Sequence, residues 1–504
     1  MSDSSSFARP LNGSAPHLGC PYWLGLLVVF CISLTLFTRH NSFPHTYHPD
    51  EDTKVQQVLS GKRNFFHPLL MLTATDGAMR LAQISKTPEN AARTGRWISA
   101  VFTAVAVVSL TILAYRWAGW IAGVGASILL MLNPLIFELA HYFKEDPALL
   151  MGMAVSFLAL DFFWKTPTAR TAAFLGFGNA LAVSGKYIGV VVLLFTLPFL
   201  VAHARKNGRS LAAWFMGGLL LPLFIINLPL FLDLPDFIRG LSREMTGVTG
   251  GHRGLRREVP HAFYFGRMLE LTPPLLWLAF PLSVGVFLWR KSERSYSQLA
   301  TFAFPVFFFA LLSFSPKTAG RYLLPVQAYL AFGSALGLVC FARAASGWKK
   351  IIIVAVLAAG VWSSASITAG YFREFSTDSR SDLRVWLNEN TPAEAVIAED
   401  GRVNLEADPA WRSRKVLTSE YVPDLGSIEE MRARGVTHVA VARQAYKPYL
   451  DKNIKPKAAE KAAFERRAAF YRALFASGNP VWESPLGAVI YLRPGIRVYA
   501  VPER

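Results

Sequence analysis

Two acidic clusters near the start of the chain hold residue types from which a catalytic site can be built. The first is His48-Pro49-Asp50-Glu51-Asp52, and the second is Lys144-Glu145-Asp146-Pro147. Both stand beside long apolar runs, where a carboxylate is costly to desolvate and therefore usually marks a functional position. A carboxylate at such an edge can serve as a general base, because it only accepts protons and is partly shielded from water.

Simpler roles fit the same residues. Pro49 suits the first turn of a helix, where the three acids that follow it complement the helix dipole. Asp146, which also precedes a proline, is typical of a helix N-cap. Carboxylates beside histidines can instead hold a divalent cation, and Glu51, Asp146 and His48 are the candidate ligands. The sequence therefore leaves a metal cofactor open and requires none.

A third group is cationic and aromatic. Lys317, Arg321 and Tyr322 lie in the segment 315–325, which is predicted to be a very short loop outside the membrane. Basic residues on such a loop run against the usual charge bias, and a lipid phosphate is their natural partner. Lys186, at the outer end of a predicted helix, can join this group. The alternative is that these long side chains only reach toward the membrane interface.

Membrane-spanning helices are the elements that must position these residues. Of the 504 residues, 52% are hydrophobic and only 17% are charged. The net charge of +18 lies largely in loops and not in a dense basic stripe, which argues against nucleic acid as a partner. About eleven apolar segments are long enough to span a bilayer. They are residues 22–38, 95–115, 117–137, 147–164, 169–185, 187–203, 211–231, 274–290, 299–314, 321–342 and 350–371.

The basic short loops orient these helices, because such loops stay in the cytoplasm. Residues 1–21 are then a cytoplasmic tail, and residues 22–371 form the membrane domain. Both acidic clusters and the cationic loop face the extracytoplasmic side of the cell inner (plasma) membrane. The outer loops are residues 39–94, with a surface-lying or re-entrant amphipathic helix at 66–84, and residues 232–273, whose glycine-rich part is either a lid or a plain linker.

The last part of the chain, residues 372–504, changes character and contains no spanning run. Strand-like and helix-like pieces alternate in it, which predicts a small extracytoplasmic α/β domain. The expected strands are Ala395–Ala398, Thr437–Val441 and Ala488–Leu492, and the expected helices are Asp382–Asn388 and Lys457–Ala476.

The order of these motifs is similar to that of a known family. An acidic pair in the first outer loop is followed by His67-Pro68-Leu69, by a second acid before a spanning helix, and by Arg321-Tyr322-Leu323-Leu324-Pro325. Over roughly residues 20–371, this pattern resembles the GT-C-fold glycosyltransferases of the dolichyl-phosphate-mannose protein mannosyltransferase and bacterial aminoarabinose-transferase type.

The resemblance implies a GT-C-like fold and a glycosyltransferase. Such an enzyme moves a sugar from a polyprenyl-phosphate donor, with inversion, to an extracytoplasmic acceptor that is a lipid, a glycan or a protein. By position, Asp50 matches the general base with Glu51 beside it, and Asp146 with Glu145 matches the second acid. The residues matched to the lipid phosphate and its surroundings are Arg321, Lys317, Lys186, Tyr322 and His67.

Two other classes of protein fit parts of the sequence. A transporter or lipid flippase would place ionisable groups near the membrane midplane and often shows repeated halves. Here the acids gather at one face and no repeat is visible. A membrane scaffold whose C-terminal domain binds a partner would leave the acidic clusters without a purpose. The sequence therefore favours the transferase.

Overall fold

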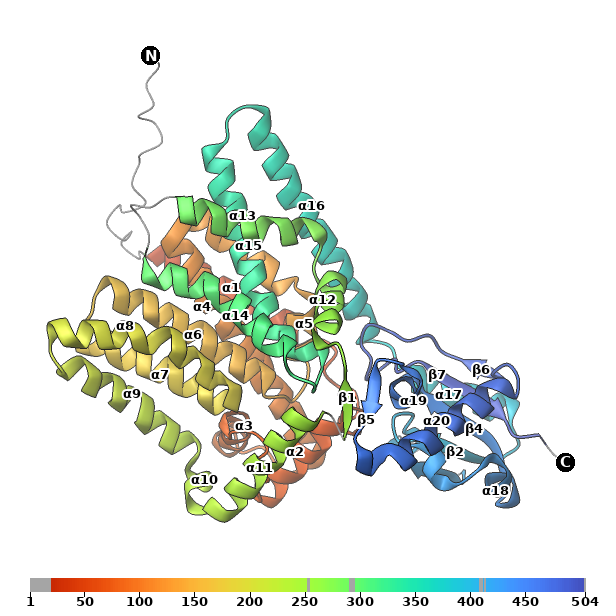
Figure 1. Cartoon of the computed structure of the whole chain (residues 1–504). Coiled ribbons are helices and arrows are strands. Elements are labelled where there is room, and N and C mark those ends of the chain that lie inside the picture. The colour runs from red at the N-terminus through yellow and green to blue at the C-terminus, as the bar shows by residue number, and fades with distance from the viewer. Residues whose placement is uncertain (1–19, 252–253, 290–294, 408–410, 412–413, 503–504) are drawn as a thin grey trace.

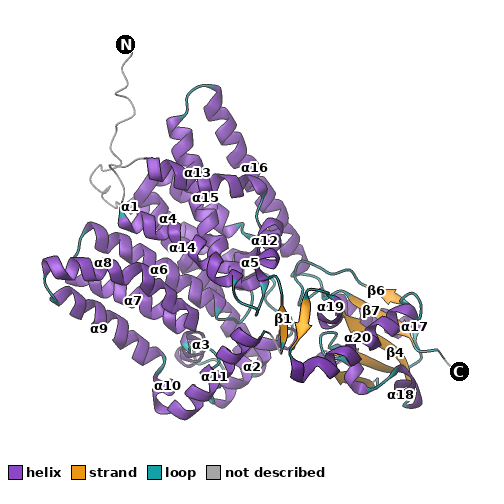
Figure 2. Ribbon diagram, viewed as in Figure 1, coloured by secondary structure: helices purple, strands orange, loops and turns teal. Residues whose placement is uncertain are grey.

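The protein consists of a large helical body and a small C-terminal domain that contains a β-sheet (Figures 1 and 2). The computed structural model describes residues 20–251, 254–289, 295–407, 411 and 414–502. The predicted fold class, a helical membrane protein with a small C-terminal α/β part, is confirmed. The predicted tail 1–21 lies almost entirely outside the described residues.

Sixteen helices precede the C-terminal domain in the described part of the chain. They are α1 (Cys20–Thr38), α2 (Pro49–Ser60), α3 (Leu70–Leu81), α4 (Pro88–Met131), α5 (Pro134–Ala140), α6 (Asp146–Lys165), α7 (Ala169–Gly185), α8 (Val192–Asn207), α9 (Ser210–Ile226), α10 (Leu228–Leu232), α11 (Leu234–Gly250), α12 (Pro260–Leu271), α13 (Pro274–Trp289), α14 (Tyr296–Ser313), α15 (Leu324–Ala344) and α16 (Trp348–Glu374).

Six helical segments in the described ranges are long and apolar enough to cross a membrane, by length and composition. They are Pro88–Met131, Asp146–Lys165, Tyr187–Arg205, Tyr296–Ser313, Gly320–Arg343 and Trp348–Glu374, and two shorter apolar helices cover Tyr22–Thr38 and Ser210–Ile226. The protein is thus a multi-pass membrane protein. The count of eleven spans stays a prediction.

A kink and a cap explain how the second and third predicted spans differ from the structure. The second span lies within α4 and the third begins in it, and α4 bends at Ala118 and Gly119, where the glycine takes the left-handed φ of 75°. The helix then stops at Met131, six residues before the predicted end. Asn133 begins α5 by accepting hydrogen bonds from the first amides of that helix. The second acidic cluster lies just after the end of this short helix.

Close packing of α6 against α7 brings two charged ends together. A Cβ atom on Gly152 would lie 2.2 Å from the backbone nitrogen of Ala182, and one on Gly185 would lie 2.6 Å from that of Leu149. Only glycine permits this approach. Because α6 begins with Asp146 and α7 ends just before Lys186, the contact sets the two residues side by side.

The C-terminal domain contains a five-stranded mixed sheet in the order β3-β2-β4-β7-β6, with β2 parallel to β3 and β4. Its strands are β2 (Val396–Asp400), β3 (Val416–Ser419), β4 (Val436–Ala442), β6 (Trp482–Glu483) and β7 (Ile496–Ala500), and its helices are α17 (Ser379–Asn390), α18 (Ile428–Ala433), α19 (Arg443–Leu450) and α20 (Lys461–Ala476). Two predicted strands and both predicted helices overlap these elements.

The predicted strand Ala488–Leu492 is wrong, because these residues form a turn. Side chains from elsewhere take the backbone groups that a sheet would use. Glu374 accepts a hydrogen bond from the amide of Val489, and Arg380 donates one to the carbonyl of Tyr491. Strand β7 pairs antiparallel with β4 instead.

A two-stranded ribbon joins the C-terminal domain to the segment of the body between α11 and α12 (Figure 1). Strand β1 (Leu255–Arg257) pairs antiparallel with β5 (Ile454–Pro456). Arg257 extends the link, because its side chain donates to Asp451 and its amide donates to the carbonyl of Pro316. The ribbon therefore ties the C-terminal domain to the short loop that carries Lys317.

Candidate active site

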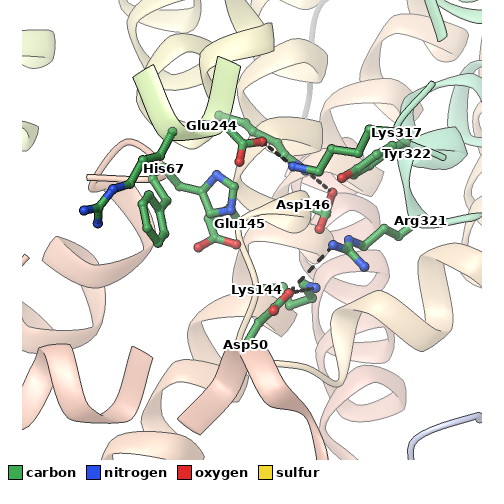
Figure 3. A pocket seen from close by; sticks show the side chains of 12 residues that line it. Asp50, His67, Lys144, Glu145, Asp146, Glu244, Lys317, Arg321 and Tyr322 are labelled. Atoms are coloured by element: carbon green, nitrogen blue, oxygen red, sulfur yellow. Dashed lines mark hydrogen bonds and ion pairs between the residues drawn. The ribbon is translucent and has the colours of Figure 1, made fainter. Parts of the chain in front are cut away.

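A polar cavity of about 300 Å³ contains most of the residues that the sequence singled out. Asp50 lies on α2, Lys144, Glu145 and Asp146 lie at the start of α6, and Lys317, Arg321 and Tyr322 lie before α15. His67 and Lys186 also line the cavity, together with Arg243 and Glu244 from α11. In Figure 3, Asp50 and Arg321 point toward each other, as do Glu244 and Lys317, in each case from separate elements.

Asp50 lies at one end of the cavity, between two cations (Figure 3). Its Oδ2 is 2.5 Å from Nζ of Lys144 and 3.8 Å from a guanidinium nitrogen of Arg321. Burial alone raises the pKa of Asp50, but the charges of Lys144 and Arg321 outweigh burial and hold it well below its usual range. Asp50 is therefore ionised, and 39% of its side chain stays accessible to a second molecule.

His48 fixes the helix that carries Asp50. Burial lowers the pKa of this imidazole well below its usual value, so the ring is neutral. Its Nδ1 accepts a hydrogen bond from the amide of Asp50 at 3.1 Å, which caps α2. Tyr491, from the turn in the C-terminal domain, packs on this ring with 4.0 Å between ring centroids.

Asp146 and Lys186 form the second ion pair of the cavity. Nζ of Lys186 is 2.8 Å from Oδ1 of Asp146 and 4.8 Å from the ring centroid of Tyr322. Oδ2 of Asp146 is buried and accepts no hydrogen bond in the structure. A buried carboxylate oxygen without a donor is costly, so this atom offers an acceptor to a ligand that enters the cavity.

Glu145 and His67 form one wall. Lys54, one helical turn after Asp50, places its Nζ 3.0 Å from a carboxylate oxygen of Glu145. Burial raises the pKa of Glu145, but the charge of Lys54 outweighs burial, so the pKa is lowered overall and the carboxylate is ionised. Burial lowers the pKa of His67, so its imidazole is neutral and can both donate and accept a hydrogen bond.

Glu51 differs from its neighbour, because it points away from the cavity. Its carboxylate is fully buried and accepts two hydrogen bonds from the guanidinium of Arg96, at 3.0 and 2.6 Å. A third comes from the amide of Phe143 at 2.7 Å. These bonds join α2, α4 and the loop before α6. The geometry gives Glu51 a structural role, in place of the catalytic one that the sequence suggested.

The three candidate metal ligands are not brought together. Glu51 is engaged by Arg96, His48 caps α2, and Asp146 pairs with Lys186. Within the described ranges, no group of three His, Cys, Asp or Glu side chains could hold a metal ion. The three side chains proposed from sequence as metal ligands therefore lie apart, each with a different partner.

An apolar groove of about 450 Å³ adjoins the polar cavity. Its walls include Leu149, Val190, Met245, Phe308 and Leu311. Six residues line both spaces, namely His67, Asp146, Lys186, Glu244, Lys317 and Tyr322. The polar cavity and the apolar groove thus meet at a boundary that holds two lysines.

Sequence reasoning missed Glu244, Lys54 and Tyr491. Glu244 pairs with Lys317 at 2.7 Å, but it lies in a stretch of an arginine-containing loop that has no recognisable motif. Lys54 had a usable signal, because it lies four residues after Asp50 and so on the same face of α2. Tyr491 is far away in the sequence, and the pattern around it suggested a strand.

Comparisons with known proteins give the fold. The structure of ArnT from Cupriavidus metallidurans bound to undecaprenyl phosphate is similar with a TM-score of 0.50 and 14% identity, over 86% of this chain and 95% of that chain. The structure of the archaeal oligosaccharyltransferase AglB from Archaeoglobus fulgidus, in complex with an inhibitory peptide and a dolichol-phosphate, is similar with a TM-score of 0.51 and 13% identity. That match covers 85% of this chain and 70% of the other.

The chain has the GT-C fold. Residues 80–229, from the end of α3 to the start of α10, match the sequence model of the family described as "Dolichyl-phosphate-mannose-protein mannosyltransferase". No curated protein sequence matches the chain. The predicted resemblance to PMT-like and ArnT-like proteins is thereby confirmed, and within this GT-C fold the polar cavity and the apolar groove are the features that bear on function.

Proposed function

We propose that this protein is an inverting glycosyltransferase that takes a sugar from a polyprenyl-phosphate donor and transfers it to an acceptor outside the membrane. The observation that carries the proposal is the boundary between the polar cavity and the apolar groove, which contains Lys186 and Lys317. A lipid-linked sugar phosphate has the same three parts in the same order: a polar sugar, an anionic phosphate and an apolar chain.

The groove suits the lipid part of the donor. Its walls are aliphatic and aromatic, and a polyprenyl chain buried there gains about 25 cal/mol for each Å² of apolar surface removed from water. The solved structures of similar fold support this assignment, because one is bound to undecaprenyl phosphate and another to a dolichol-phosphate. With the chain held in the membrane, the sugar is positioned at little further cost in entropy.

The cations suit the phosphate. Lys186 and Lys317 lie at the boundary, and Arg321 lies between it and Asp50. When the bond between the anomeric carbon and the phosphate oxygen breaks, its electron pair stays on that oxygen. The phosphate thereby gains one negative charge, which fixed cations stabilise in the transition state. No general acid is needed for this leaving group.

Asp50 suits the base. An acceptor hydroxyl or amine attacks the anomeric carbon from the face opposite the phosphate, which inverts the configuration, and its proton passes to the Asp50 carboxylate. In the ligand-free protein, Lys144 and Arg321 hold this carboxylate. A donor phosphate that draws Arg321 away leaves Asp50 with one cation fewer, and this makes it a stronger base.

The site, by this proposal, faces the extracytoplasmic side of the plasma membrane, together with the domain formed by residues 372–504. The partners of the protein are the lipid-linked donor, membrane lipid and an acceptor that is a lipid, a glycan or a protein. Asp146 and Glu145 complete the sugar site as acceptors for hydroxyl groups, with His67 and Tyr322 beside them.

The test is release of polyprenyl phosphate by the purified protein. A panel of synthetic polyprenyl-phosphate sugars is supplied with envelope extract as the source of acceptor. We expect release from one donor, and a decrease of about 10²–10⁴-fold in Asp50→Asn, because a positioned base contributes about that much. Asp52→Asn is the matched control, since Asp52 lies on the same helix with 49% of its side chain exposed. No release from any donor, or equal rates in Asp50→Asn and the wild type, would contradict the proposal.

A further inference from the structure

Glu244 occupies a position that neither the family pattern nor the base assignment explains. It lies on α11 in the outer loop, and its carboxylate is 2.7 Å from Nζ of Lys317. It lines both the polar cavity and the apolar groove. Figure 3 shows Glu244 and Lys317 at the end of the cavity opposite Asp50.

In the proposed complex, the donor phosphate lies beside Glu244 at the boundary between the cavity and the groove. If the sugar fills the cavity and the chain fills the groove, the phosphate that joins them lies at the shared boundary. Both lysines there already have a carboxylate partner, Lys186 at 2.8 Å from Asp146 and Lys317 at 2.7 Å from Glu244. A phosphate can reach these lysines only by displacing a carboxylate or by sharing the cation with it.

Glu244 is the carboxylate that can move. Asp146 is the first residue of α6, and its side chain is 3% exposed in a tightly packed helix pair. Glu244 is 24% exposed, and its neighbour Met245 on α11 is largely exposed. Moving Glu244 needs only a rotation of its side chain toward solvent, whereas moving Asp146 would disturb the packing of α6.

We propose that Glu244 is a competing carboxylate that holds Lys317 before the donor binds and takes it back after transfer, which weakens binding of the polyprenyl-phosphate product. This inference rests on the proposed function. The donor is a phosphodiester with one negative charge, and the product is a monoester with a charge of about −1.5 to −2 at neutral pH. The cations of the site therefore hold the product more strongly than the donor, and a resident carboxylate offsets that difference.

Removing the negative charge of Glu244 should strengthen binding of the lipid phosphate. Without its charge, residue 244 no longer competes for Lys317. We expect Glu244→Gln to bind undecaprenyl phosphate about two- to fivefold more tightly than the wild type, which is the range for loss of a partly exposed ion pair. The affinity for undecaprenol, which has the same chain without a phosphate, should not change.

The experiment measures the affinity of the purified full-length protein, in one detergent, for undecaprenyl phosphate and for undecaprenol. Lys317→Met should bind the phosphate several-fold more weakly. Glu270→Gln is the matched control, because Glu270 pairs with Arg267 on α12 of the same outer loop and lines neither space. It should bind as the wild type does. Thermal unfolding of each variant checks that the fold is intact.

Two results separate this inference from the function on which it rests. A wild type that prefers the phosphate over the alcohol, with Glu244→Gln binding the phosphate equally or more weakly, overturns the competing role of Glu244. A wild type that binds undecaprenyl phosphate no better than undecaprenol overturns the proposed function itself. Tighter binding of the phosphate alone in Glu244→Gln supports the inference.

Discussion

Two regions of this protein bury acidic residues, and they do so in opposite ways. In the cavity, Asp50 and Glu145 each lie beside a lysine, at 2.5 and 3.0 Å. Burial raises the pKa of both carboxyls, but the neighbouring cations lower it by a larger amount. The pKa is therefore lowered overall, and both carboxylates stay ionised. The cavity thus keeps its acids charged by surrounding them with positive charge.

The C-terminal domain buries Glu399 and Asp400 at the end of β2, and no cation in the described part of the domain lies at hydrogen-bond distance from either carboxylate. Asp400 accepts hydrogen bonds from the amides of Val422 and Ala442 and from the hydroxyl of Tyr471. Burial outweighs these bonds and raises the pKa of both carboxyls to about 7. The hydrogen bonds of Asp400 join β2, β4 and α20 of the domain.

The difference teaches that burial alone does not mark a candidate catalytic carboxylate, and that burial beside both a cation and a cavity is the more informative pattern. It also implies opposite responses to acid. A carboxyl whose pKa is lowered on folding stabilises the protein above its unfolded pKa and loses this effect as the pH falls. A carboxyl whose pKa is raised on folding stabilises the protein at acidic pH and loses this effect as the pH rises toward 7.

The largest expected effect comes from removing a cation from a buried acid of the body. In Arg96→Met, the carboxylate of Glu51 keeps its burial and loses its charged partner. We expect a loss of about 3–5 kcal/mol in the free energy of unfolding. The double variant Glu51→Gln/Arg96→Met should be more stable than Arg96→Met, as measured by thermal unfolding in detergent. Additive losses would show that the pair does not act as a unit.

The two responses to pH can be measured directly. Between pH 5 and pH 8, hydrogen exchange should become faster around β2 as the pH rises, after correction for the intrinsic rate. The Asp50 carboxylate should add no pH dependence to α2 in this range, because it is ionised in both the folded and the unfolded state. Asp400→Asn should flatten the dependence around β2, which we expect to be on the order of 2 kcal/mol in the wild type. The same trend in both regions would contradict the comparison.

A smaller effect is expected from Tyr471→Phe. This change removes the hydroxyl that donates to Asp400 at 3.0 Å and leaves the ring in place. We expect the C-terminal domain to lose about 1 kcal/mol, the net contribution of one hydrogen bond. Limited proteolysis of the domain at pH 8 measures this loss. An effect above that of Arg96→Met would reverse the order of the two regions.

The smallest effect is expected on the surface of the same domain. Arg497 and Glu483 form an ion pair at 2.8 Å between β7 and β6, with exposed side chains. Glu483→Gln should change the free energy of unfolding by less than about 1 kcal/mol, because solvent screens such pairs. The same assay at low and high salt should give equal results for this variant.

Much of the cavity could be predicted from sequence, because hydropathy and loop charge place Asp50, Asp146 and Arg321 on one side of the membrane. Glu51 could not be separated from Asp50 by this reasoning. Neighbouring residues on a helix point about 100° apart, so one of two adjacent acids faces the cavity while the other meets Arg96. Sequence adjacency hides this difference.

The parts of the fold that sequence reasoning missed depend on contacts between distant segments. The turn that carries Tyr491 reads as a strand, and only the side chains of Glu374 and Arg380 divert its backbone from the sheet. The pairing of Glu244 with Lys317 likewise depends on the packing of α11 against the segment between α14 and α15. The general prediction of a helical membrane protein with a small α/β part needed none of these contacts.

The ribbon formed by β1 and β5 has a consequence for biosynthesis. Leu255 pairs with Pro456, and β1 also contacts the segment that carries Lys317. At roughly 5–20 residues per second, the ribosome makes the second strand about 10–40 seconds after the first. During that interval the membrane helices can insert, while the outer side of the cavity still lacks its partner strand. The ribbon therefore forms only after β5 has been made, and a truncation before β5 would leave β1 without its partner strand.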